Sequence, residues 1–153
     1  MNVSTQSLAD ALAQKAARIE RCVARAREEL DASPSFLTDF TRQDAAILNI
    51  QRACELTLDM GNMVIRHFAL GLPRSSRDVF GLLAQHGWLT PDECTTLQHM
   101  VGFRNIAVHE YDVLDIAIVQ SIIRTDLLHT SRFAGQLLLK LTHTASPPHS
   151  THP

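Results

Sequence analysis

Apolar side chains recur at intervals of three and four residues along most of this chain, and that spacing is typical of amphipathic helices. No segment alternates apolar and polar residues for long enough to indicate a strand. The periodic segments predict five helices, which cover about 4–30, 42–69, 77–86, 91–108 and 114–141. Four of these helices are long and one is short.

Polar residues, prolines and glycines mark where these helices begin and end. Thr41 is the expected N-cap of the second helix, and Ser75 or Ser76 that of the short helix, which Gly87 closes. The run Thr90-Pro91-Asp92-Glu93 predicts a capping box with proline at the first helical position. Short connections favour antiparallel neighbours, so we expect an all-α, antiparallel up-and-down helical bundle of four long helices plus one short helix.

The second helix carries two apolar stripes where a surface helix needs one. One stripe runs through Ile47, Ile50 and Cys54, and the other includes Leu48, Leu56 and Met60. Burial on two sides fits a central core helix, and it fits a helix at a subunit interface equally well.

The length and composition of the chain predict a single domain. The 153 residues are 45% hydrophobic, which suits a single globular core over residues 1–142. Residues 143–153 lack periodic apolar positions and are expected to form a disordered tail. No apolar run is long enough to cross a bilayer, and the start of the sequence lacks the pattern of a signal peptide, so we expect a cytoplasmic protein.

Charge and cysteine content exclude some classes of function. A formal net charge of −2 argues against a protein that coats nucleic acid without specificity, although it leaves room for a local basic cleft. Lys15 and Lys140 are the two lysines among 14 basic residues, and the rest are arginines, which hold phosphates in bidentate fashion. Three cysteines are spaced as buried thiols rather than as disulfides or zinc ligands: Cys22, Cys54 and Cys94.

Candidate chemistry gathers between Arg104 and Tyr111, in the pattern R-x4-H-x-Y. An arginine can hold phosphate oxygens, and His109 has an unperturbed pKa suited to a general acid or base. With these two roles filled, an RNA 2′-hydroxyl can attack the adjacent phosphorus, and neither a metal nor a cofactor is expected. Arg104 and His109 lie about 140° apart on a regular helix, so either the helix ends near Val108 or two subunits supply the partners.

This motif resembles the signature of HepT-like HEPN-domain ribonucleases, the toxins of HEPN/MNT toxin-antitoxin modules. The runs 40–62, 70–85 and 100–111 resemble HepT-type sequence, and Asn105 matches the common R-N start. The resemblance implies a homodimeric endoribonuclease that binds RNA, with Arg104 and His109 catalytic and Asn105 orienting phosphate or histidine. It also implies that an MNT-type nucleotidyltransferase antitoxin adds AMP to Tyr111 and so blocks the site.

Two other functions are compatible with a helical bundle. A non-catalytic HEPN domain that binds a nucleotide or docks a nucleotidyltransferase would keep Arg104 and cleave nothing. A di-metal carboxylate enzyme would need repeated Glu-x-x-His pairs, and Asp126 with His129 is a single approximation to one. The combined presence of His109 and Tyr111 favours the nuclease.

Overall fold

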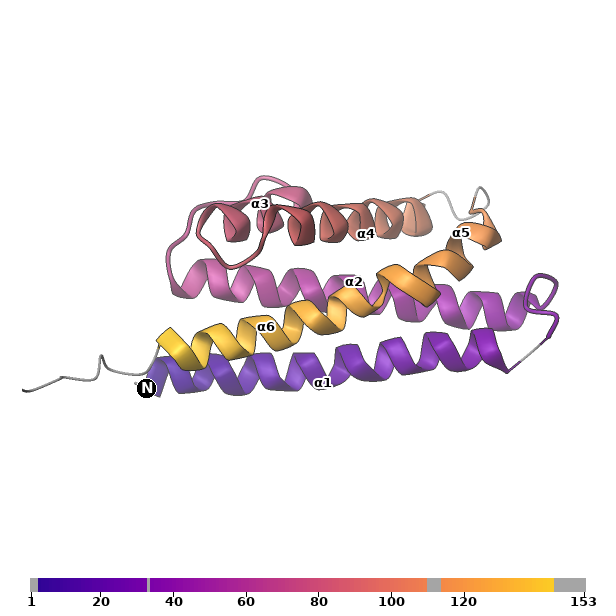
Figure 1. The fold of residues 1–153 in the computed structure, drawn as a ribbon, viewed down its shortest axis with the longest axis horizontal. Coiled ribbons are helices and arrows are strands. Elements are labelled where there is room, and N and C mark those ends of the chain that lie inside the picture. The colour runs from indigo at the N-terminus through magenta and orange to yellow at the C-terminus, as the bar shows by residue number, and fades with distance from the viewer. Residues whose placement is uncertain (1–2, 33, 110–113, 145–153) are drawn as a thin grey trace, which may run out of the picture.

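A computed structural model describes residues 3–32, 34–109 and 114–144. Within these residues every element is helical and no strand occurs, which confirms the all-α prediction (Figure 1). The elements are α1 (Val3–Asp31), α2 (Phe40–His67), α3 (Ser76–Gln85), α4 (Pro91–His109), α5 (Ile116–Ser121), a π-helical turn (Ile122–Asp126) and α6 (Leu128–Thr144). No described helix combines the length and the apolar character that spanning a membrane requires.

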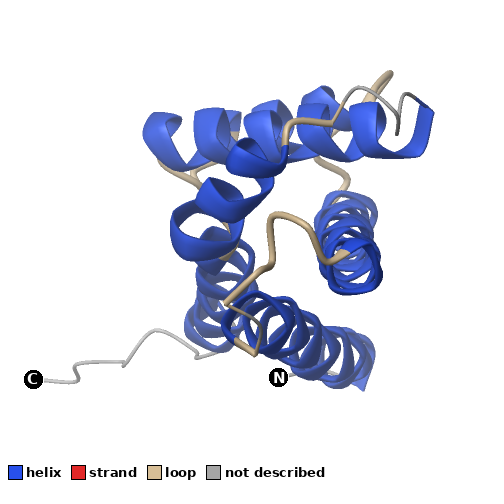
Figure 2. Ribbon diagram, turned by 90° about the vertical axis from the view of Figure 1, so that its right-hand side faces the viewer, coloured by secondary structure: helices blue, strands red, loops and turns tan. Residues whose placement is uncertain are grey.

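The long helices run up and down as expected. Helices α1 and α2 lie antiparallel along their lengths, α3 and α4 form a layer on the other side of α2, and α6 crosses back over α2 to α1 (Figures 1 and 2). The first residue of α1 and the last residue of α6 therefore lie at the same end of the bundle (Figure 1).

Helix α2 is the centre of the core, because it packs against α1, α3, α4 and α6. Its second apolar stripe is mostly covered within one chain: Leu56 and Met60 are buried, whereas Leu48 is 43% exposed. The two stripes are thus explained by a central core helix, and they give little support to a subunit interface on α2.

The helix ends follow the predicted signals with one correction. Asp39, not Thr41, caps α2, and its carboxylate accepts a hydrogen bond from the Arg42 backbone N–H at 3.2 Å. The turn at residues 35–39 places Asp39 before the first helical residue, so Thr41 already lies inside the helix. Ser75 caps α3, and Gly87 follows α3 with a φ of 77°, in the left-handed region that favours glycine.

The predicted capping box of α4 is confirmed. The Thr90 hydroxyl accepts from the Glu93 backbone N–H at 3.2 Å, and the Glu93 carboxylate accepts from the Thr90 backbone N–H at 3.0 Å. The same carboxylate accepts from Gln136 Nε2 at 2.9 Å, which joins the start of α4 to α6.

The last predicted helix is not continuous. A π-helical turn at Ile122–Asp126 separates α5 from α6, and the Leu127 N–H bonds the Ile122 carbonyl at 2.8 Å, five residues back. The Thr125 hydroxyl donates to the Ser121 carbonyl at 2.6 Å. Helix α6 includes 143 and 144, the first two residues of the predicted tail, and 145–153 lie outside the described residues, so the tail stays a prediction.

Candidate functional site

The motif begins on the last two turns of α4, where Arg104 faces α2. Its Nη2 donates to the Glu55 carboxylate at 3.2 Å, and its Nη1 donates to the Asn105 side-chain oxygen at 3.1 Å. The Arg104 side chain is 26% exposed and that of Glu55 is 49% exposed, so the pair sits at the rim of the bundle. Glu55 and Asn105 together fix the plane of the guanidinium.

Arg104 retains donors for a ligand. A guanidinium has five N–H groups, and two of them bond Glu55 and Asn105. Nε is buried and has no hydrogen-bond partner among the described residues. An anion that approaches the exposed side of Arg104 can therefore accept hydrogen bonds without first displacing both of its present partners.

A buried thiol lies beneath Arg104. Cys54 Sγ donates to the Met100 carbonyl at 3.6 Å, which joins α2 to α4 one turn before the arginine. Burial raises the pKa of the Cys54 thiol to about 12; the positive charge of Arg104 opposes this shift and the carboxylate of Glu55 adds to it. Cys54 is thus a neutral packing group. All three cysteines are free and buried, as the sequence predicts.

The other predicted site residues are placed in part. Asn105 is exposed and bonds Arg104. Helix α4 is described as far as His109, whose side chain lies outside what the structure describes, so the predicted helix end near Val108 stays a prediction. Tyr111, the predicted site of AMP addition, lies outside the described residues.

An apolar groove of about 420 Å³ runs along the other side of α4, between α4 and the α5 segment. Ile106 and Ile118 line it and are 44% and 53% exposed. Sequence periodicity did not predict this groove, because residues 114–141 were expected to form one continuous helix.

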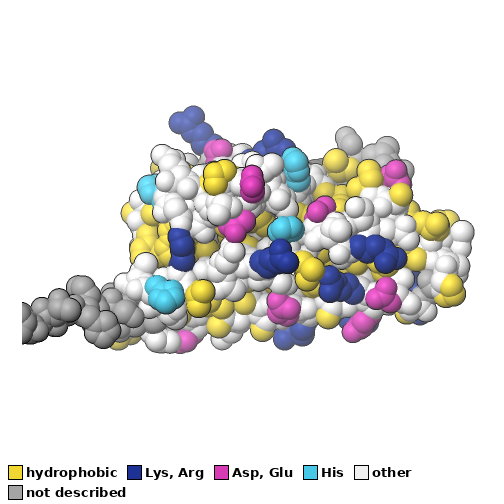
Figure 3. Space-filling view, in the orientation of Figure 1, with side chains coloured by type: hydrophobic (Ala, Val, Ile, Leu, Met, Phe, Trp, Pro, Cys, Tyr) yellow, Lys and Arg dark blue, Asp and Glu magenta, His cyan; other side chains and the backbone are white. Residues whose placement is uncertain are grey.

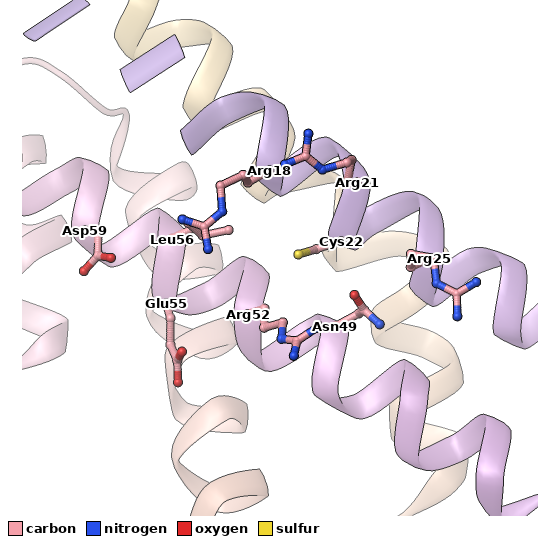
Figure 4. A pocket seen from close by; sticks show the side chains of 9 residues that line it. All are labelled: Arg18, Arg21, Cys22, Arg25, Asn49, Arg52, Glu55, Leu56 and Asp59. Atoms are coloured by element: carbon pink, nitrogen blue, oxygen red, sulfur yellow. The ribbon is translucent and has the colours of Figure 1, made fainter. Parts of the chain in front are cut away.

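A second groove, of about 510 Å³, lies between α1 and α2 (Figure 4). We call it the arginine groove, because Arg18, Arg21 and Arg25 of α1 and Arg52 of α2 line it. Elsewhere the surface is mixed: on the face drawn in Figure 3, basic, acidic and histidine side chains are interspersed. Sequence reasoning also missed the arginine groove and Glu55.

No three His, Cys, Asp or Glu side chains within the described ranges gather as metal ligands would. Asp126 lies in the π-helical turn and hydrogen-bonds with Thr125 at 3.4 Å, and His129 lines a small cavity with Glu93. These two residues therefore do not form part of a described di-metal site.

Comparison with known proteins identifies relatives of this chain in both sequence and fold. The chain is 42% identical to the mRNA nuclease HepT of Shewanella oneidensis over 124 residues, which are 81% of this chain and 93% of that protein. A toxin-antitoxin crystal structure with AMP-PNP matches with a TM-score of 0.80 and 40% identity, covering 84% of this chain and 97% of that one.

A tri-AMPylated HEPN toxin of Shewanella oneidensis in complex with MNT antitoxin also matches, with a TM-score of 0.80 and 39% identity, covering 90% of this chain and 98% of that one. The family described as ribonuclease HepT-like matches residues 12–137, which include the whole of α2, α3 and α4. The chain is a homologue of the HepT mRNA nuclease toxins and belongs to the ribonuclease HepT-like family.

Proposed function

We propose that this chain is a metal-independent endoribonuclease toxin that cleaves RNA by attack of a 2′-hydroxyl. The observation that carries the proposal is Arg104, which stands at the family's motif with its guanidinium oriented by Glu55 and Asn105 and with donors to spare. Family membership and 42% identity to a protein named mRNA nuclease HepT support the same reaction class.

In this reaction the 2′-oxygen forms a bond to phosphorus while the bond from phosphorus to the 5′-oxygen breaks. A base removes the 2′-hydroxyl proton and an acid protonates the departing 5′-oxygen, leaving a 2′,3′-cyclic phosphate and a 5′-hydroxyl. We assign general acid–base catalysis to His109, because imidazole exchanges protons near neutral pH. Arg104 holds the non-bridging oxygens as their charge grows, and Asn105 keeps Arg104 in position.

We propose that the active form is a homodimer in which two motifs share one cleft. The support is geometric: on the regular helix that α4 forms, the backbone positions 104 and 109 face about 140° apart, so a second copy is the simplest source of the missing partner. The apolar groove beside Ile106 offers a surface for that contact. Light scattering should give a dimer, and a stable monomer that cleaves RNA would overturn this part of the proposal.

We further propose that an MNT-type nucleotidyltransferase antitoxin neutralises the toxin by adding AMP to Tyr111, in the cytoplasm where both act on their substrates. The support is the related toxin that is tri-AMPylated in its complex with MNT antitoxin. Mass spectrometry after co-expression with the cognate antitoxin should find AMP on Tyr111. Adducts on another residue, or on the Tyr111→Phe variant, would contradict the assignment.

The nuclease assay uses purified protein, single-stranded RNA and a chelator. Wild type should give fragments ending in 2′,3′-cyclic phosphate, and His109→Ala and Arg104→Gln should each lower the rate by about 100-fold or more, as loss of an acid-base or charge-stabilising group does. His86→Gln and Arg124→Gln change exposed residues of the same types and should cleave normally. Equal cleavage by His109→Ala, or none by wild type, would favour a non-catalytic docking domain.

A further inference from the structure

The arginine groove concentrates positive charge between two helices of a chain whose net charge is −2. Arg18, Arg21 and Arg25 lie three and four residues apart, so they share one face of α1 over about 10 Å of helix. In Figure 4, Arg18 reaches across toward α2, and Cys22 points into the gap between the two helices.

Most of this charge is not neutralised within the protein. Arg25 is paired with Glu28 at 3.1 Å and with Glu29 at 2.7 Å. By contrast, none of the carboxylates in the described ranges pairs with Arg18, Arg21 or Arg52. The two acidic residues that line the groove have other partners, since Asp59 is 3.6 Å from Lys15 and Glu55 bonds Arg104.

The three arginines without a counterion lie close enough to one buried thiol, that of Cys22, to affect its pKa. Burial raises the pKa of the Cys22 thiol at the floor of the groove, and the charges of Arg52, Arg18 and Arg21 each oppose that shift. Three like charges held around one buried group repel one another, which is unfavourable in the absence of an anion. Their arrangement is complementary to a negatively charged ligand.

The arginine groove leads to the candidate site. Glu55 is a member of both, because it lines the groove and accepts a hydrogen bond from Arg104. Arg52 precedes Glu55 by about 4.5 Å of helix rise, roughly the distance between neighbouring turns. A ligand that extends from Arg104 along α2 would therefore reach Arg52 and then the arginines of α1.

We propose that the arginine groove binds the sugar-phosphate backbone of the RNA strand on one side of the phosphate held by Arg104. This inference rests on the proposed nuclease function and names where its substrate runs. Guanidinium groups bind phosphates in bidentate fashion, and contacts to phosphates carry no sequence information by themselves. The groove is lined by no aromatic side chain among the described residues, so base stacking adds nothing there and binding should not depend on sequence.

The test compares two triple variants of equal charge. Arg18→Gln/Arg21→Gln/Arg52→Gln removes the unpaired arginines, and Arg66→Gln/Arg124→Gln/Arg132→Gln removes three exposed arginines outside the groove. The probe is a labelled single-stranded RNA with 2′-O-methyl groups, which 2′-hydroxyl attack cannot cleave. Binding is measured against salt concentration, and circular dichroism verifies that both variants are helical.

Each phosphate contact to a single strand contributes about 0.7 to the slope of log affinity against log salt concentration. The slope of the groove variant should therefore be smaller than that of wild type by about 2. If the two proteins bind equally at 1 M salt, the variant should bind about 100-fold more weakly than wild type at 0.1 M salt. The loss should be the same for RNAs of different sequence. The control variant should keep the wild-type slope, and Arg→Lys changes at the three groove positions should preserve most of it because the charge remains.

The outcomes separate this inference from the function on which it rests. If wild type cleaves RNA and the groove variant binds the probe with the wild-type slope, the groove is not the RNA path although the nuclease stands. If wild type neither binds nor cleaves, the proposed function itself fails. Loss of antitoxin binding by the groove variant, with unchanged RNA affinity, would overturn the inference and assign the groove to the antitoxin.

Discussion

Replacement of Gly61 by alanine tests how closely α3 packs on α2. A Cβ at this position would lie 2.6 Å from Val79 Cγ1 and 3.3 Å from Leu83 Cδ1. Both neighbours are buried, and valine is stiff at χ1, so Val79 cannot rotate away cheaply. In an open helix interior the same substitution stabilises by about 1 kcal/mol. Overpacking costs about 1–3 kcal/mol, so we expect Gly61→Ala to be destabilising by about 0–2 kcal/mol.

Gly135→Ala in α6 is the matched control, because an added Cβ there meets nothing within 4 Å. It should gain about 1 kcal/mol from helix propensity alone. Urea unfolding followed by circular dichroism should therefore separate the two variants by about 1–3 kcal/mol, or several degrees in Tm at about 2–4 °C per kcal/mol.

A double-mutant cycle identifies the contact responsible. Val79→Ala removes the methyl group nearest to the new Cβ, so the pair Gly61→Ala/Val79→Ala should show favourable coupling of about 0.5–3 kcal/mol. If Gly61→Ala stabilises as much as Gly135→Ala, or if the coupling is zero, then close approach of α3 is not what excludes a side chain from position 61.

Two further predictions concern titratable groups. With a pKa raised to about 12 by burial, Cys54 should react with a thiol reagent no faster than the protein unfolds, measured in a Cys22→Ala/Cys94→Ala background; the rate of an exposed thiol would contradict its burial. The pKa of Glu93 is lowered, chiefly by the Thr90 backbone N–H, so its carboxylate stabilises the fold above the unfolded-state pKa and loses that effect as pH falls through the folded-state pKa. Glu93→Ala should cost about 1 kcal/mol at neutral pH, and urea titrations should show the difference from wild type shrinking below about pH 4; a difference independent of pH would refute this.

The sequence was sufficient for the helices but not for every detail of their ends. Apolar periodicity located the core helices because each buries a continuous stripe, and the Thr90 to Glu93 capping box is a local interaction that needs no tertiary information. Asp39 and Thr41 are both good N-caps, and the choice between them depends on the turn that precedes α2. The π-helical turn was missed because Val119, Ile123 and Leu127 keep helical spacing across it.

The candidate site shows a similar division. Arg104 was found from the motif, whereas its partner Glu55 is 49 residues away in sequence and is brought to it by packing of α2 against α4. The stripe of Arg18, Arg21 and Arg25 was visible in the spacing, but a stripe of arginines usually marks a solvated helix face. The stripe becomes one wall of a groove because Arg52 of α2 lies opposite it. The alignment of α2 with α1 that brings Arg52 there cannot be obtained from periodicity alone.

The π-helical turn has a mechanical consequence for the last helix. Helix α6 packs against α1, α2 and α4, while α5 contacts chiefly the π-helical turn and directly follows the segment that contains Tyr111. The turn lies between them, and within it the Thr125 hydroxyl donates to the Ser121 carbonyl at 2.6 Å. Val119 of α5 and Ile123 of the turn are buried in the core, and the turn packs against α1, so displacement of α5 by a bulky group or a bound protein would disturb core packing at these residues. Binding next to the motif is thus coupled to the hydrophobic core through α5.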